Sequence, residues 1–226
     1  MNLHETMETF SNEWWKSIII ILVTIAVLTI LPKKYTWAQS TYYPKSIALL
    51  LLLNLVIENG YAISTGSWNH KQNLPLHLCG FSSLLGIALM FRFNLFWAEL
   101  FYFFGLTGGI HSLLTPEFDL GKDGFFYYAY FISHGGLILV VAYLVIHQNL
   151  TLRKNSWLRA FVAIQILALG VGVFNYITGS NYMYLSTPPI VENPLIVGPW
   201  PWYILVFEAL ALLHFFVFYK AYSLIK

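Results

Sequence analysis

Seven long apolar stretches, separated by shorter polar segments, recur along the chain. A helix needs about 20 mostly apolar residues to cross a bilayer, because each residue adds only ~1.5 Å. The pattern therefore predicts an all-α, polytopic membrane protein with seven transmembrane helices in a single domain, residues 1–226. The third stretch is short and follows Pro75, so we expect it to be shallow or partly unwound. The predicted spans are Trp14–Leu31, Ser46–Ile63, Leu76–Phe91, Asn94–Leu114, Phe125–Ile146, Trp157–Ile177 and Trp200–Tyr219.

Composition agrees with the hydropathy pattern. Hydrophobic residues make up 58 % of the 226 residues and charged residues 10 %, against roughly 25 % charged in soluble domains. This balance excludes a disordered chain, a coiled coil and a basic nucleic-acid binder, so no nucleic-acid partner is expected. Cys79 is the single cysteine, which excludes an internal disulfide and a multi-cysteine zinc or iron–sulfur site.

Basic residues predict the orientation of the helices. Nine lie in or beside the loops of one side and three on the other, and the richer side should face the cytoplasm. The N-terminus is then outside and the C-terminus inside, as expected for a multi-pass protein of the cell membrane. The richer side carries Lys33, Lys34, Lys45, Arg92, Arg153, Lys154, Arg159, Lys220 and Lys226, and the other side Lys16, Lys71 and Lys122.

The first stretch and the last loop need separate comment. Lys33 and Lys34 follow the first stretch and no small-x-small cleavage site does, which favours a spanning helix over a signal peptide. The segment 178–199 has 22 residues and one charge, Glu192. A long loop of this kind is predicted to be an extracytoplasmic lid, or a cap without a catalytic role.

Polar side chains gather near the predicted outer face. Ionisable groups inside a bilayer are costly, so each is a functional candidate, although each could instead be a buried pair that fixes helix packing. Five helices bring polar groups to compatible depths, which predicts one cavity open to the outer leaflet. On the inner side, Arg92 and Glu99 are predicted to form a structural ion pair. The candidate site residues are Glu58, His77, Cys79, His111, Tyr127, Tyr130, His134, Asn175, Asn181 and Tyr182.

Cys79 suggests nucleophilic chemistry. A thiol becomes a nucleophile when a histidine takes its proton and a third group orients that histidine. At helical spacing His77 lies about 200° from Cys79, so the base is expected on another helix. We therefore predict Cys79 as nucleophile, His134 as base and Glu58 as the orienting group. The other predicted site residues would bind substrate, and Tyr127, Tyr130 or Asn175 would donate to the oxyanion or the headgroup. The alternative is that Cys79 is a small apolar filler.

A zinc site is a further alternative. His77, His111, His134, Cys79 and Glu58 include the residue types that bind zinc. No helix, however, carries a His-x-x-x-His or His-x-x-x-Asp pair. We therefore predict no metal and no other cofactor.

Five blocks of sequence resemble a known family. They are LPLHLCG (Leu74–Gly80), GGIHSLLTP (Gly108–Pro116), FISHGG (Phe131–Gly136), NYITGSNYMYL (Asn175–Leu185) and GPWPWY (Gly198–Tyr203). They are similar to the bacterial YwaF-like membrane proteins and, more loosely, to the eukaryotic transmembrane protein 164 family. The resemblance implies a seven-helix protein of the plasma membrane. The eukaryotic relatives move fatty acyl groups between phospholipids, with a cysteine nucleophile that would match Cys79 and a histidine that would match His134.

The leading hypothesis is a membrane-embedded lipid acyltransferase. An acyl chain would pass from a phospholipid to a lysophospholipid through a thioester on Cys79, and water as acceptor would make the protein a hydrolase. Two other classes remain open at this point. One is a binding or transport protein for a small amphiphile, and the other is a zinc-dependent membrane lipid hydrolase.

Overall fold

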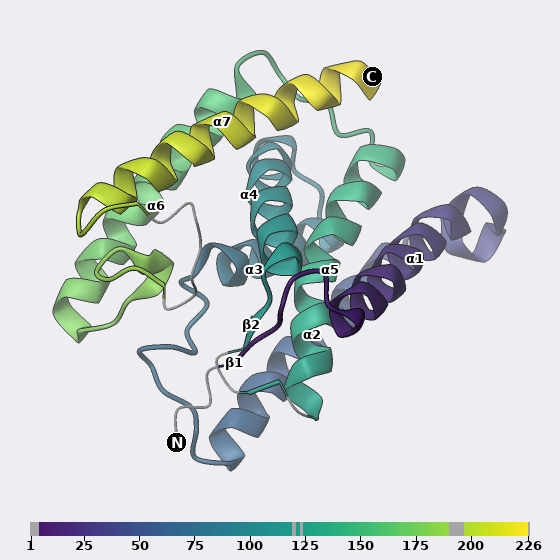
Figure 1. Cartoon of the computed structure of the whole chain (residues 1–226). Coiled ribbons are helices and arrows are strands. Elements are labelled where there is room, and N and C mark those ends of the chain that lie inside the picture. Colours follow the sequence, from purple (N-terminus) through teal and green to yellow (C-terminus); the bar gives the residue numbers. More distant parts are fainter. Residues whose placement is uncertain (1–4, 119–120, 123, 190–196, 226) are drawn as a thin grey trace.

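The computed structural model describes residues 5–118, 121–122, 124–189 and 197–225. Within these ranges the chain forms seven α-helices (Figure 1). They are α1 (Asn12–Lys34), α2 (Tyr42–Ser64), α3 (Leu78–Phe91), α4 (Leu95–Leu114), α5 (Phe125–His147), α6 (Ser156–Thr178) and α7 (Trp202–Ile225). Two 3-10 helices, η1 (Thr36–Gln39) and η2 (Tyr182–Tyr184), and two short strands, β1 (Glu5–Thr6) and β2 (Glu117–Phe118), complete the order.

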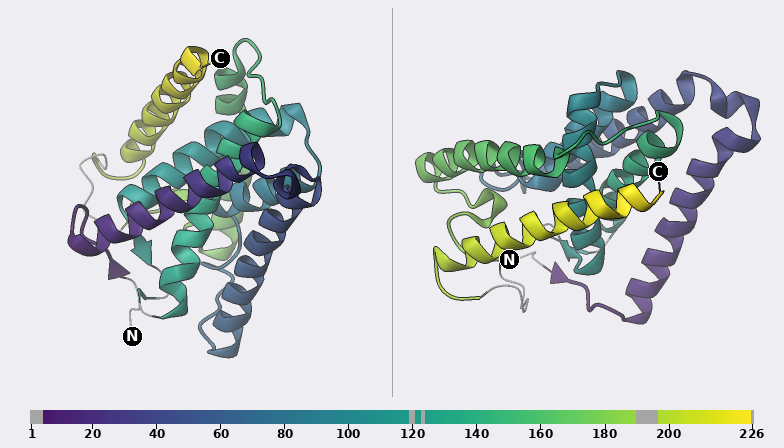
Figure 2. Two further views of the ribbon diagram at one scale, coloured as in Figure 1. Left: turned by 90° about the vertical axis from the view of Figure 1, so that its right-hand side faces the viewer. Right: turned by 90° about the horizontal axis from the view of Figure 1, so that it is seen from above.

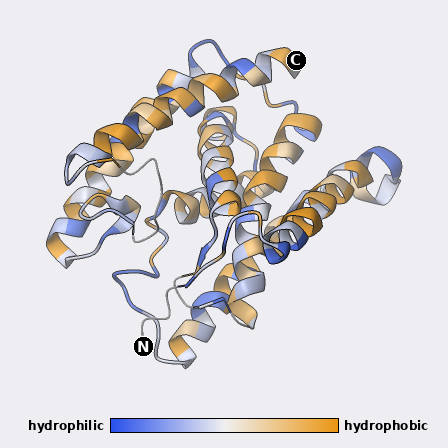
Figure 3. Cartoon of the chain, in the orientation of Figure 1, coloured by the Kyte–Doolittle hydropathy of each residue, from blue (hydrophilic) through white to orange (hydrophobic). Residues whose placement is uncertain are grey.

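Apolar residues dominate the helices and polar residues their connections (Figure 3). Five helices, α1, α2, α5, α6 and α7, are long and apolar enough to span a membrane. The expectation of an all-α protein with several spans is thus confirmed. The short third helix has 14 residues and a length of about 21 Å, less than the ~30 Å hydrocarbon core. The crossing of all seven helices and the direction of the termini remain predictions.

The centre of the fold is made by α4 and α5. α4 contacts α3, α5, α6 and α7, whereas α1 and α2 pack against α5. Figure 2 shows the α6–α7 pair on one side of the central helices and α1 with α2 on the other. α4 buries Phe101, Phe103 and Phe104 almost completely. α4 is not one of the five candidate spans, and it contains the polar residues Glu99 and His111.

Connections far apart in sequence meet at two opposite ends of the bundle. At the first, which we call the β end, Glu5 of β1 pairs with Phe118 of β2 in an antiparallel register. At the second, which we call the Glu99 end, the Tyr222 hydroxyl donates to the carbonyl oxygen of Leu150. The predicted topology assigns the β end to the outside of the cell.

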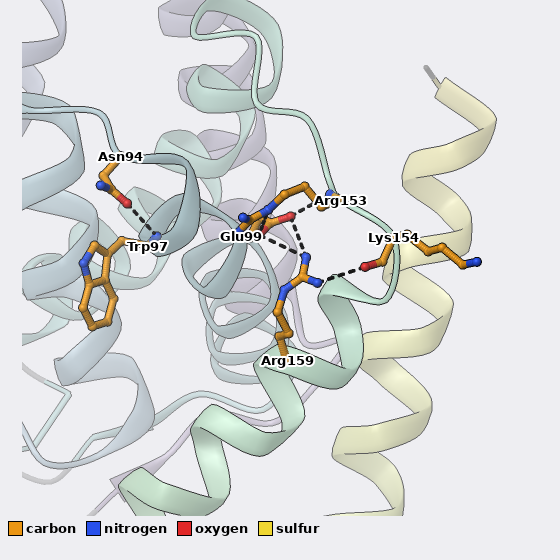
Figure 4. Close-up of polar contacts among 6 residues, drawn as sticks. All are labelled: Asn94, Trp97, Glu99, Arg153, Lys154 and Arg159. Atoms are coloured by element: carbon orange, nitrogen blue, oxygen red, sulfur yellow. Dashed lines mark hydrogen bonds and ion pairs between the residues drawn. The ribbon is translucent and has the colours of Figure 1, made fainter.

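The ion pair predicted between Arg92 and Glu99 is wrong. Glu99 is 1 % exposed and accepts from the backbone N–H of Arg153 at 2.6 Å and from its Nε at 2.9 Å. Arg159 Nη2 donates to Glu99 Oε1 at 3.2 Å (Figure 4). Arg92 caps the end of α3 and is exposed. Glu99 lies one turn inside α4. The connection from α5 to α6 passes this position, so the partners of Glu99 come from that connection and from the start of α6.

Candidate functional site

Cys79 lies in the first turn of α3, because this helix begins at Leu78 rather than at Leu76. His77 is the N-cap residue, with extended φ and ψ of −68° and 152°. The segment before it folds back onto the helix, and a Cβ on Gly80 would lie 2.8 Å from the Cα of Pro75. Only glycine fits this approach. Helical spacing predicts the His77 side chain on the helix face opposite Cys79. This prediction does not apply, because His77 lies outside the helix.

The thiol of Cys79 packs against α4. A Cβ on Gly108 would lie 3.0 Å from Cys79 Sγ, so the glycine provides the space that the sulfur occupies. Ser112, one turn further along α4, has its Oγ 3.5 Å from the same sulfur. Ser112 was missed by the sequence reasoning. No pattern in the apolar α4 sequence indicates which face meets α3.

Tyr130 and His134 bring α5 to the same place. The Tyr130 hydroxyl donates to the carbonyl oxygen of Ser112 at 2.8 Å and accepts from the backbone N–H of Glu117 at 3.3 Å. The Tyr130 and His134 ring centroids are 4.1 Å apart. Ser112 of α4 therefore connects α3 with α5. Its hydroxyl contacts Cys79, and its carbonyl oxygen accepts from Tyr130. The result is a continuous contact path from Cys79 to His134.

His134 has a defined ring orientation. Its Nδ1 lies 2.8 Å from the carbonyl oxygen of Tyr130. A carbonyl can only accept, so Nδ1 carries the proton and donates. In the neutral ring the lone pair is then on Nε2. This tautomer leaves Nε2 as the basic nitrogen, which is what a general base requires.

Glu58 is half-buried on the α5-facing side of α2. One turn before it, the Asn54 side chain donates to Ser133 Oγ at 2.9 Å. One turn after it, the Tyr61 ring contacts Phe126, with centroids 5.1 Å apart. Both flanking contacts join α2 to α5, so Glu58 lies on the stripe between them.

His77 and Tyr182 join two connections at the β end. The backbone N–H of Met183 donates to His77 Nδ1 at 3.2 Å. Tyr182 is completely buried, and its hydroxyl donates to the carbonyl oxygen of His70 at 2.8 Å and accepts from the N–H of Leu74 at 2.9 Å. Burial raises the pKa of Tyr182, and the hydrogen bond from Leu74 partly offsets this rise. The segment after α6 is thereby fastened over the start of α3.

Asn175 and Asn181 shape that segment. Asn175 Oδ1 accepts from the N–H of Tyr182 at 3.0 Å, and its Nδ2 donates to the Tyr182 carbonyl oxygen at 2.8 Å. Asn181 Oδ1 accepts from the N–H groups of Ser186 and Thr187, both at 3.0 Å. Both side-chain amides are thus engaged in holding the loop.

Tyr127 and His111 have their polar contacts with helices other than α3. The Tyr127 hydroxyl lies 2.6 Å from Ser17 Oγ on α1. His111 Nε2 lies 3.3 Å from His214 Nε2 on α7. Among the described residues no group of three or more His, Cys, Asp or Glu side chains is positioned to hold a metal ion.

A set of apolar helices around a buried polar cluster defines a multi-pass integral membrane protein. The TMEM164 family profile matches residues 9–219. The chain belongs to the TMEM164 family, which confirms the resemblance seen in its sequence blocks. It is also similar to an uncharacterized protein of Treponema pallidum (strain Nichols), with 23 % identity over 198 residues that cover 87 % of this chain and 82 % of the relative. No solved structure matches the chain.

Proposed function

We propose that this protein is a lipid acyltransferase of the bacterial plasma membrane that transfers acyl groups between phospholipids through Cys79. The observation that carries the proposal is the contact path from Cys79 through Ser112 and Tyr130 to His134. A thiol, a hydroxyl, a phenol and an imidazole are thereby grouped inside a largely apolar bundle. Polar groups in such surroundings are costly unless they serve packing or function.

The reaction is a double displacement. The thiol proton of Cys79 passes to His134 Nε2, and the sulfur attacks the ester carbonyl carbon of a phospholipid. The carbon–oxygen ester bond breaks, and the proton returns to the departing lysophospholipid oxygen. A second lysophospholipid hydroxyl then gives its proton to His134 and attacks the thioester, which restores the thiol.

Neighbouring groups support these steps. The Tyr130 carbonyl accepts from His134 Nδ1 and favours the tautomer with a basic Nε2. Glu58 would stabilise the imidazolium that forms when His134 takes the thiol proton. The first turn of α3 has backbone N–H groups that its own hydrogen bonds leave unpaired. Such groups stabilise the oxyanion of an acyl-transfer intermediate.

Residues 178–199 would act as a lid over this site, with the described part resting on His77. The Met183 N–H donates to His77, and the Tyr182 and Tyr184 rings lie 5.1 and 5.4 Å from the His77 ring. Residues 190–196 of the predicted lid lie outside the described residues. A lid at this place would exclude water and favour a lysophospholipid as acceptor.

Acyl exchange tests the proposal directly. Purified protein is incubated with phospholipid and lysophospholipid that differ in isotopic label, and the products are followed by mass spectrometry. We expect exchange that Cys79→Ala and His134→Ala abolish, with a thioester on Cys79 in the intact-protein mass. His147→Ala, on the same helix, is the matched control, because His147 bonds to the Thr29 carbonyl at the Glu99 end. Exchange that survives Cys79→Ala would refute the proposal, and release of free fatty acid would indicate hydrolysis.

Thiol labelling separates catalysis from simple lipid binding. An amphiphilic thiol probe should label Cys79 faster than a lipid-facing cysteine at Val56, which is 57 % exposed, placed in a Cys79→Ala background. His134→Ala should remove the excess rate. His77→Ala should have a smaller effect, because its Nδ1 is engaged with Met183. If Cys79 were labelled at the same rate in the unchanged protein and in His134→Ala, His134 would not be the base that activates the thiol.

A further inference from the structure

An open apolar groove runs between α1, α2 and α5 on the outside of the bundle. Its volume is about 390 Å³, within the range of small-ligand sites. The walls are apolar and include Ile21 and Leu28 of α1, Leu50 and Leu51 of α2, and Phe131 and Ile132 of α5. From Tyr42 to Leu51 the α2 wall is about 13 Å long. The groove is therefore apolar and long enough to take part of a hydrocarbon chain.

Two glycines form part of the groove on the α5 side. A Cβ on Gly135 would lie 2.9 Å from Ile21 Cγ2, and one on Gly136 would lie 2.5 Å from Leu51 Cδ2. α1 and α2 therefore approach α5 closely at this level. The groove between them is a built feature of the packing.

Aromatic residues line the groove at the Glu99 end, and basic residues lie in the same α1–α2 connection. Trp37, Tyr42 and Ser46 line it there. Lys45 Nζ lies 6.0 Å from the Tyr42 ring centroid, and Lys34 Nζ lies 5.6 Å from that of Tyr35. Lys33 is also exposed. Figure 3 shows this connection as a hydrophilic tip between two apolar helices.

The charge at this rim has one sign. From residue 32 to residue 57 the sequence has three lysines and no acidic residue. Clusters of basic residues beside a membrane span attract anionic lipids, and indole and phenol rings prefer the headgroup level. The rim thus complements an anionic headgroup, while the groove complements an acyl tail.

We propose that this groove binds one acyl chain of an anionic glycerophospholipid, with the phosphate at Lys33, Lys34 and Lys45. The ester groups of this lipid lie near the rim at the Glu99 end, whereas Cys79 lies near the start of α3 towards the β end. The bound lipid is therefore a second lipid, separate from the substrate of the proposed acyl transfer. It fastens α1 and α2 to α5 from outside.

Native mass spectrometry of the full chain in detergent tests the charge at the rim. The probes are phosphatidylglycerol and phosphatidylcholine with identical acyl chains. We expect phosphatidylglycerol to be retained more strongly, by roughly fivefold for each lysine that contacts it. Substitution of all three lysines, Lys33→Gln with Lys34→Gln and Lys45→Gln, should abolish this preference. Lys16→Gln, on α1 at the other end, should leave it unchanged.

Two neighbouring leucines test the groove itself. Leu50 lines the groove and Leu49 does not, although both are exposed, by 65 % and 50 %. Leu50→Trp should fill the groove and lower retention of both lipids severalfold, and Leu49→Trp should not. Ile132→Trp should fill the groove from α5, and it replaces Leu50→Trp in this test if that variant does not fold.

Three results would overturn the proposal. They are equal retention of the two lipids by the unchanged protein, a preference that survives the lysine substitutions, and equal loss in the Leu50 and Leu49 variants. Equal loss in the two leucine variants would mean that the lipid belongs to a non-specific shell around the protein. Cys79→Ala should bind phosphatidylglycerol normally, so loss of acyl transfer and loss of this site are distinguishable.

Discussion

Glu99→Gln removes the charge at the centre of the Glu99 end and keeps the size of the side chain. The carboxylate accepts from the Arg153 backbone and from the guanidinium groups of Arg153 and Arg159 (Figure 4). A glutamine amide has one accepting oxygen, and its NH2 group would face guanidinium N–H donors. At least one hydrogen bond to a charged group is therefore lost.

The size of the effect follows from burial. A hydrogen bond to a charged group contributes about 1.5–3 kcal/mol, and breaking a fully buried ion pair costs about 3–5 kcal/mol. Glu99 is 1 % exposed, but the side chains of Arg153 and Arg159 are 49 % and 38 % exposed and can regain water. We therefore expect Glu99→Gln to cost about 2 kcal/mol, or about 4–8 °C in Tm for a chain of this length.

Thermal unfolding in detergent, followed by far-ultraviolet circular dichroism, supplies the assay. This signal does not depend on the reactivity of Cys79, which is itself predicted to be high in the folded protein. Glu13→Gln is the control, because Glu13 is 49 % exposed and lies 3.8 Å from Lys122. Surface pairs of this kind contribute about 0–1 kcal/mol. Equal Tm values for the two variants would refute the argument that the Glu99 charge holds this end together.

Three further predictions concern the other end and the topology. Gly108→Val should displace the Cys79 thiol, which is 3.0 Å from the position of the added Cβ, and should slow acyl exchange at least tenfold while circular dichroism still shows a folded protein. Tyr182→Phe should lower stability by about 1–2 kcal/mol through loss of its buried hydroxyl bonds, whereas Tyr176→Phe, at a site 91 % exposed, should change it little. A reporter fused after Lys226 should be cytoplasmic, and external activity would reverse the predicted orientation.

The positions of the helices could be predicted from the sequence, because runs of apolar residues define them. α5 was predicted as Phe125–Ile146 and observed as Phe125–His147. The start of α3 was misplaced by two residues. Pro75 and Gly80 pack against each other, and this tertiary contact keeps the chain up to His77 outside the helix.

The faces of the helices could not be predicted in the same way. A spanning helix that is apolar on most sides has no clear stripe to show which side is inward. His111 and Ser112 are adjacent in α4, yet His111 contacts α7 and Ser112 contacts Cys79. The prediction that Arg92 is the partner of Glu99 was wrong for a related reason. Arg92 was close in sequence, while Arg153 is 54 residues away and approaches only after α5 has packed.

That separation has a consequence for biosynthesis. Glu99 leaves the ribosome 54 residues before Arg153, which is roughly 3–11 s at normal translation rates. During this interval α4 contains a carboxyl group whose arginine partners do not yet exist. The buried charge of α4 is therefore neutralised by its arginine partners only after α5 and the start of α6 have been made.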